Sequence, residues 1–121
     1  MSMILVADDD IYIREMFNDL LPKGAEVVTV ENGRTLVNHY DENRNYCLII
    51  TDKDMPQLDG LGAIRKIREF DKNVEIWMMS GDVDVIATER AALEAGANRF
   101  YPKPVSVKFL NDIEEFICNC R

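Results

Sequence analysis

The sequence has few cysteines, a shortage of basic charge and no long apolar run, and each feature excludes a class of protein. Three cysteines, Cys47, Cys118 and Cys120, are an odd number unsuited to a disulfide framework, so we expect a reducing compartment. Fourteen Lys and Arg residues against 22 Asp and Glu residues give a net charge of −8, which opposes binding to nucleic acid and anionic lipid. No apolar run approaches a membrane span, and the acidic residues 8–10 leave no room for a signal peptide. We therefore expect a cytoplasmic protein that binds neither nucleic acid nor membranes.

The pattern that is present is a regular alternation of short apolar runs and helical stripes. The length of 121 residues fits one domain, which we expect to span residues 1–121. Strands are predicted at residues 3–7, 26–30, 47–51, 74–79 and 98–101. A helix follows each strand, and in the first one Ile13, Met16, Phe17 and Leu20 share a face before Pro22. Five such units, with strands that are apolar throughout, predict an α/β doubly wound fold: a parallel sheet with helices on both faces.

Polar residues collect where the predicted strands end. Asp8, Asp9 and Asp10 follow the first strand, Asp52 the third, Ser80 the fourth and Lys103 the fifth. In open α/β sheets, ligands bind outside the carboxyl ends of the strands. The sequence therefore places three or more carboxylates, a hydroxyl and an ammonium at one edge of the sheet, although Asp10 can also be a helix N-cap.

This grouping predicts a site for a metal ion and a phosphoryl group. Neighbouring carboxylates raise one another's pKa unless a counter-charge is present, and Mg²⁺ favours a few carboxylates together with phosphate oxygens. Lys103 as a cation and Ser80 as a hydroxyl donor would face those oxygens. A carboxylate in such a place can act as a nucleophile and become an acyl phosphate.

Five segments in order resemble the receiver domain of two-component response regulators, and the resemblance covers essentially the whole chain. The most specific is the phosphorylation-site segment, Ile49–Asp52 followed by Met55–Gly60. The others are Val6–Asp9 with Arg14, Trp77–Gly81, Glu94–Ala97 and Phe100–Pro104. The resemblance implies a flavodoxin-like (βα)5 fold with strand order 2-1-3-4-5, as in chemotaxis regulators. Arg14 is otherwise interpreted as a solvated helix residue.

The resemblance also assigns the chemical roles. Asp52 would accept the phosphoryl group, and Lys103, joined to Pro104 by a cis bond, would pair with the phosphoryl oxygens. Asp8, Asp9 and Asp52 would bind Mg²⁺, with Mn²⁺ as a substitute, and the backbone carbonyl of Asp54 would complete the set of protein ligands.

A conformational switch and its partners are implied in the same way. Ser80 would move to the phosphoryl group, and Phe100 would be the aromatic residue that rotates with it. The phosphodonor would be a sensor histidine kinase or a histidine phosphotransfer protein. The fourth helix, fifth strand and fifth helix would contact an output partner, an output domain or a second copy of the chain. We expect no output domain within the sequence and no enzyme activity beyond assisting phosphorylation and dephosphorylation of Asp52.

Two acidic positions are predicted to tune the reaction. Asp54 and Asp82 lie two residues after Asp52 and Ser80, at places where members of this family differ. We hypothesise that their negative charge crowds the phosphoryl group and raises the demand for magnesium.

Two other functions fit parts of the sequence. One is a degenerate receiver that acts only as a dimerisation or docking module, which the full set of polar residues opposes. The other is a small phosphatase of the haloacid-dehalogenase type, because Asp52-Lys53-Asp54 resembles its nucleophile motif. That motif normally follows the first strand of its fold, whereas here it follows the third predicted strand.

Overall fold

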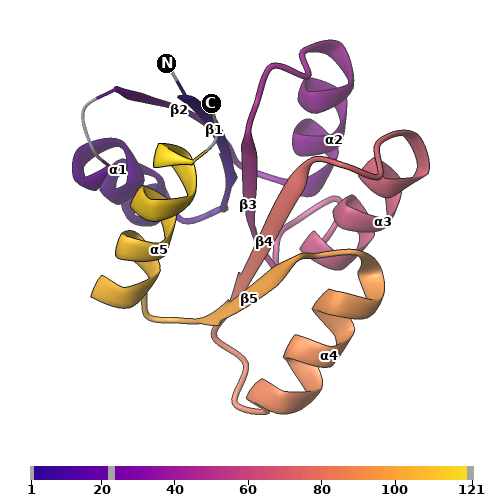
Figure 1. Ribbon diagram of the computed structural model, residues 1–121. Coiled ribbons are helices and arrows are strands. Elements are labelled where there is room, and N and C mark those ends of the chain that lie inside the picture. The colour runs from indigo at the N-terminus through magenta and orange to yellow at the C-terminus, as the bar shows by residue number, and fades with distance from the viewer. Residues whose placement is uncertain (1, 22–23, 120–121) are drawn as a thin grey trace.

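The computed structural model describes residues 2–21 and 24–119, so the predictions made for Pro22 and Cys120 lie outside the described residues. Within them, five strands alternate with five helices along the chain (Figure 1). The strands are β1 (Ser2–Ala7), β2 (Ala25–Val30), β3 (Leu48–Asp52), β4 (Glu75–Ser80) and β5 (Arg99–Pro102). The helices are α1 (Ile11–Leu20), α2 (Gly33–Glu42), α3 (Gly60–Phe70), α4 (Val85–Ala95) and α5 (Val107–Cys118).

The strands form one parallel sheet in the order β2-β1-β3-β4-β5, which confirms the predicted fold and strand order. Helices α1 and α5 cover one face of this sheet, and α2, α3 and α4 cover the other (Figure 1). The chain changes its direction of winding between β1 and β3. Residues that follow these two strands therefore lie on either side of the crevice in which such sheets bind ligands.

The buried strands explain why the apolar runs were continuous. In β1, Ile4 and Val6 pack under α1 and α5, whereas Leu5 and Ala7 pack under the other three helices. All four residues are fully buried. Since successive side chains of a strand point to opposite faces, a strand covered on both faces must be apolar at every position.

Three strands, β3, β4 and β5, extend one residue further than predicted, and in β3 and β4 the extra residue is polar. Asp52 is the last residue of β3 and pairs in register with Met79, and Ser80 is the last residue of β4 and pairs with Pro102. The pattern of apolar residues cannot mark a strand end that carries a polar side chain. The extension fixes the backbone of both residues within the sheet.

Helices α1 and α2 begin at residues of types that favour helix N-caps. Asp10 and Asn32 are the N-caps of α1 and α2, and their side chains accept hydrogen bonds from the N–H groups of Tyr12 and Thr35. Asp10 is thus the helix cap that the sequence allowed it to be. None of the helices in the described part of the chain is long and apolar enough to cross a membrane.

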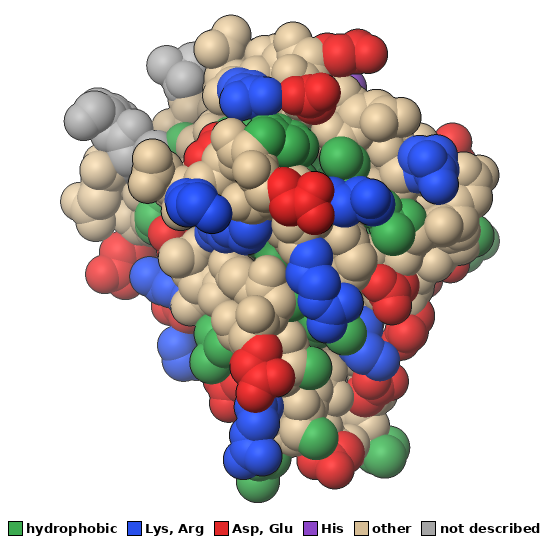
Figure 2. All heavy atoms as spheres, turned by 90° about the vertical axis from the view of Figure 1, so that its right-hand side faces the viewer, with side chains coloured by type: hydrophobic (Ala, Val, Ile, Leu, Met, Phe, Trp, Pro, Cys, Tyr) green, Lys and Arg blue, Asp and Glu red, His purple; other side chains and the backbone are tan. Residues whose placement is uncertain are grey.

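The α2–α3–α4 face has a mixed charge. Figure 2 shows Lys and Arg side chains interspersed with Asp and Glu side chains over this face. Arg65 and Lys66 of α3 are exposed, as is Glu69 one turn further along. The net negative charge of the chain therefore does not form a continuous acidic surface on this side of the molecule.

Candidate functional site

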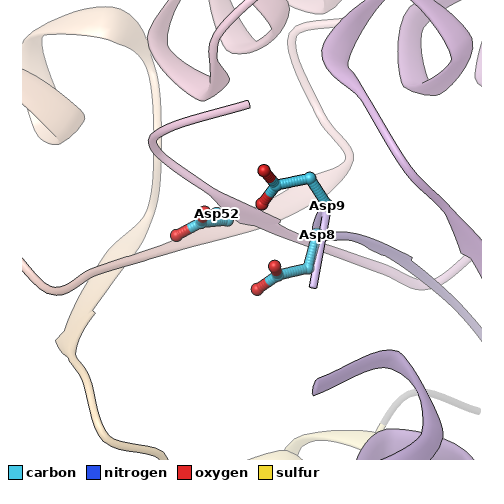
Figure 3. A group of neighbouring side chains, drawn as sticks. All are labelled: Asp8, Asp9 and Asp52. Carbon is cyan, nitrogen blue, oxygen red and sulfur yellow. The ribbon is translucent and has the colours of Figure 1, made fainter. Parts of the chain in front are cut away.

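Three carboxylates meet at the carboxyl ends of β1 and β3. Asp8 and Asp9 follow β1 directly, and Asp52 ends β3. One oxygen from each carboxylate lies within 4.8 Å of the others (Figure 3). Asp8 is fully buried and Asp52 is 5% exposed, whereas Asp9 is exposed at the mouth of the group. The structure thus brings together the three acidic side chains that the sequence placed at one edge of the sheet.

Lys103 reaches this group from the end of β5. Its Nζ lies 3.0 Å from Asp8 Oδ2 and 3.1 Å from Asp52 Oδ1. The backbone helps to hold it there, because Lys103 N donates to the carbonyl oxygen of Ser80 at 2.7 Å. The peptide bond between Lys103 and Pro104 is cis, as expected. One ammonium group is therefore shared between two buried carboxylates.

The electrostatics of the group follow from its burial. Burial, and secondly the charge of Asp8, raises the pKa of Asp52 to about 6, although Lys103 acts in the opposite direction. Burial also raises the pKa of Asp8. Burial alone would lower the pKa of the Lys103 ammonium, but its hydrogen bond to Asp8 and the charge of Asp52 raise it above its ordinary value. Three carboxyl groups share one ammonium group, so the site favours an additional cation.

Oxygen ligands in this arrangement fit a hard divalent cation. One carboxylate oxygen from each of Asp8, Asp9 and Asp52 borders a common space. Asp9 is exposed, so this space is in contact with water. Mg²⁺ retains several waters and takes a few carboxylates, whereas softer metals favour histidine and cysteine ligands. The three carboxylates therefore fit the Mg²⁺ site that the sequence predicts.

Arg14 holds the backbone of Asp8, so its interpretation as only a solvated helix residue is wrong. Its guanidinium group donates to the backbone carbonyl of Asp8 at 2.8 Å, and Arg14 is only partly exposed. The backbone N–H of Asp10 donates to the carboxylate of Asp8 at 2.9 Å. These two bonds fix the turn between β1 and α1. The position of Arg14 in the first turn of the helix that follows the acidic residues was the available signal.

Ser80 and Phe100 make contacts outside the carboxylate group. Ser80 is 1% exposed, and its Oγ accepts a hydrogen bond from the N–H of Asp82 at 3.0 Å. Phe100 is 9% exposed and packs in the apolar core beneath α2, α3 and α4. Their movement during switching stays a prediction, as does the use of the Asp54 carbonyl as a ligand.

Lys53 is the residue at this edge that the sequence analysis missed. Its Nζ lies 2.7 Å from Asp82 Oδ2 and 3.6 Å from Asp54 Oδ1. It therefore pairs with both of the acidic residues that were expected to crowd the site. The available signal was its position between Asp52 and Asp54, but nothing in the local sequence points to Asp82, 29 residues away.

Comparison with known proteins identifies one family. The family described as response regulator receiver domain matches residues 4–113. The chain is 37% identical over 105 residues to the chemotaxis protein CheY of Bacillus subtilis, and the match covers 84% of each protein. It is 38% identical over 119 residues to the DNA-binding transcriptional regulator NtrC of Azospirillum brasilense, which covers 98% of this chain and 24% of that protein. The chain thus spans about a quarter of the length of that relative.

Solved structures agree with this result. A response regulator receiver domain protein from Clostridium thermocellum superposes with a TM-score of 0.85 at 28% identity, covering 99% of this chain and 94% of that one. The receiver domain of Ssk1, crystallised with the histidine phosphotransfer protein Ypd1 of Saccharomyces cerevisiae, gives a TM-score of 0.87 at 26% identity. That match covers 97% of this chain and 89% of the Ssk1 domain.

Proposed function

This chain belongs to the response-regulator receiver family of two-component signalling modules, and we propose that its Asp52 accepts a phosphoryl group from a phosphohistidine. The donor would be a sensor histidine kinase or a histidine phosphotransfer protein. The observation that carries the proposal is the contact of one buried carboxylate, Asp52, with the ammonium of Lys103 and with the acidic pair Asp8 and Asp9. We also propose that the protein acts in the cytoplasm, binds neither nucleic acid nor membranes through this domain, and turns over no other substrate.

The chemistry requires Asp52 to be ionised. Since its pKa is about 6, the carboxylate form dominates at neutral pH. A carboxylate oxygen attacks phosphorus, the bond from phosphorus to the histidine nitrogen breaks, and an acyl phosphate forms on Asp52. Lys103 is already within 3.1 Å of the attacking carboxylate, so its charge is in place for the transferred oxygens. Attack of water on phosphorus then releases inorganic phosphate and restores the carboxylate.

A divalent cation fits the remaining ligands. Asp8, Asp9 and Asp52 would hold Mg²⁺, or Mn²⁺ in its place, together with the backbone carbonyl of Asp54. When bound, the cation supplies positive charge to the phosphoryl oxygens. Arg14 keeps the Asp8 backbone in position through its carbonyl, and the Asp10 N–H orients the Asp8 carboxylate.

The donor protein would dock where the site opens to solvent. Asp9 lies at this opening, and the first residues of α1 beside it, Ile11 and Tyr12, are 53% and 78% exposed. Exposed apolar side chains next to a reactive group are typical of a protein docking surface. The structure of Ssk1 with Ypd1 supports a phosphotransfer protein as one class of donor.

The output partner would bind to the surface formed by α4, β5 and α5. A new phosphoryl group adds about two negative charges, and each charge-assisted hydrogen bond it gains is worth on the order of 1.5–3 kcal/mol. Bonds to Ser80 and Lys103 of that size would shift a two-state equilibrium by tenfold or more.

A hollow of about 760 Å³ lies between α4 and β5 and is lined by Leu93, Phe100 and Tyr101, among others. Figure 2 shows hydrophobic side chains at the end of the face where α4 lies. Ile86 of α4 is 74% exposed.

Intact mass measurement tests the proposal. After incubation with acetyl phosphate and Mg²⁺, the protein should gain the mass of one phosphoryl group, and Asp52→Asn should gain none. Asp41→Asn, which alters an exposed carboxylate of α2, is the matched control and should gain the same mass as the parent chain. A folded parent chain with no adduct would favour the dimerisation or docking module. Turnover of a model phosphoester would favour the haloacid-dehalogenase-type phosphatase.

A further inference from the structure

Lys53 ties together two loops at the carboxyl edge of the sheet. It is the first residue after β3, and it pairs with Asp82 in the loop that joins β4 to α4, with Nζ 2.7 Å from Oδ2. The Lys53 side chain is 23% exposed and the Asp82 side chain is 38% exposed, so both charges are partly shielded from water. The backbone reinforces the link, because Lys53 N donates to the carbonyl oxygen of Met79 at 2.9 Å.

Asp82 is also the residue that holds the hydroxyl of Ser80. Its backbone N–H donates to Ser80 Oγ at 3.0 Å, and Ser80 is almost fully buried. One residue therefore makes two contacts, with its side chain bound to Lys53 and its N–H bound to the hydroxyl of Ser80. A movement of Ser80 Oγ away from the Asp82 N–H would break this hydrogen bond, and the ion pair with Lys53 would keep Asp82 from following it.

We propose that Lys53 is a positioning residue that clamps Asp82 and thereby holds Ser80 in its unphosphorylated arrangement. This inference rests on the proposed phosphorylation of Asp52 and deepens it, because it assigns control of the switch to the ion pair between Lys53 and Asp82. It also changes the expected role of the acidic positions. Asp82 acts through its pair with Lys53 and the geometry of its loop, and not through free negative charge beside the phosphoryl group.

Lys53→Met and Asp82→Ala test the clamp. If charge alone set the rate of phosphorylation, the two substitutions would change that rate in opposite directions. Loss of a cation would slow the reaction with an anionic phosphodonor, and loss of an anion would speed it. Loss of the clamp frees Ser80 in both variants, so both should be phosphorylated by acetyl phosphate about three- to fivefold faster than the parent chain. The double variant should be no faster than either single variant, because both substitutions break the same contact.

Two further variants provide controls. Lys53→Arg keeps a cation that can reach Asp82 and should restore the parent rate. Lys66→Met removes an exposed charge from α3, away from both loops, and should leave the rate unchanged.

Nuclear magnetic resonance of the unphosphorylated protein tests the clamp independently of the reaction. The amide resonance of Asp82 should shift in Lys53→Met and stay at its parent position in Lys53→Arg and Lys66→Met. Rates that change in opposite directions, additive effects in the double variant, or an unmoved Asp82 resonance would overturn the clamp. If the parent chain forms no adduct, the proposed function fails, and the Asp82 resonance still decides whether the clamp exists.

Discussion

Replacing Asp52 with asparagine should stabilise the domain at neutral pH although it removes the phosphoryl acceptor. The pKa of this carboxyl is raised from 3.8 to about 6, mainly by burial. A difference of about 2 pK units corresponds to about 3 kcal/mol, because each unit is worth 1.36 kcal/mol. The side chain is only 7% exposed, so water screens little of this cost. Asparagine has a similar shape and never ionises.

The pH dependence gives the sign of the effect. Below pH 3.8 the carboxyl is protonated in both the folded and the unfolded chain, and ionisation costs nothing. Between pH 3.8 and about 6 the unfolded chain loses this proton while the folded chain keeps it, so the free energy of unfolding falls as the pH rises. Above pH 6 the full cost is present. The advantage of Asp52→Asn should therefore be small at pH 4 and about 2–3 kcal/mol at pH 7.5.

Urea unfolding at the two pH values measures this difference. Trp77 is the only tryptophan and is fully buried, so its fluorescence reports global unfolding. Divalent cations are removed with a chelator, since a bound cation would stabilise the parent chain alone. Asp112→Asn is the control of opposite sign, because hydrogen bonds from Lys108 and Tyr101 lower the pKa of Asp112 and make its charge stabilising at neutral pH. An effect of Asp52→Asn that does not change with pH would refute the reasoning.

Three further predictions test the geometry of the site. Mg²⁺ should raise the melting temperature of the parent chain in scanning calorimetry, and Asp9→Asn should lose most of that increase because it lacks the exposed ligand. Lys103→Met should raise the pKa of Asp52 above about 6 in a carboxyl NMR titration, and an unchanged pKa would contradict the 3.1 Å contact between Lys103 Nζ and Asp52 Oδ1. Gly60→Ala should destabilise the domain by about 1–3 kcal/mol in urea, because a Cβ there would lie 2.1 Å from the carbonyl oxygen of Asp52. Gly81→Ala, whose nearest neighbour would be 4.0 Å away, should have little effect.

The identity of the site residues could be predicted because of the way parallel sheets are built. The buried strands are apolar over most of their length, as Ile4–Ala7 shows, so the polar residues at or directly after their carboxyl ends mark that edge of the sheet. All the strands of a parallel sheet end at that same edge. Asp8, Asp52 and Lys103 were therefore expected to meet although they lie up to 95 residues apart, and they do.

The contacts made by loop residues could not be predicted in the same way. Lys53 and Asp82 lie in loops without a repeating pattern, and their pairing depends on the path that each loop takes after β3 and β4. The contact from Arg14 to the Asp8 carbonyl likewise depends on how tightly α1 turns back against β1.

The sequence by itself determined the five strands, their capped helices and the side chains that stand at the carboxyl edge, because periodicity and capping are local properties. Only the tertiary structure decided how deeply Asp52 is buried, which cation each carboxylate meets and where the Ser80 hydroxyl is held. These properties depend on desolvation and on distances between segments remote in the chain. Both are set when the helices pack on the sheet.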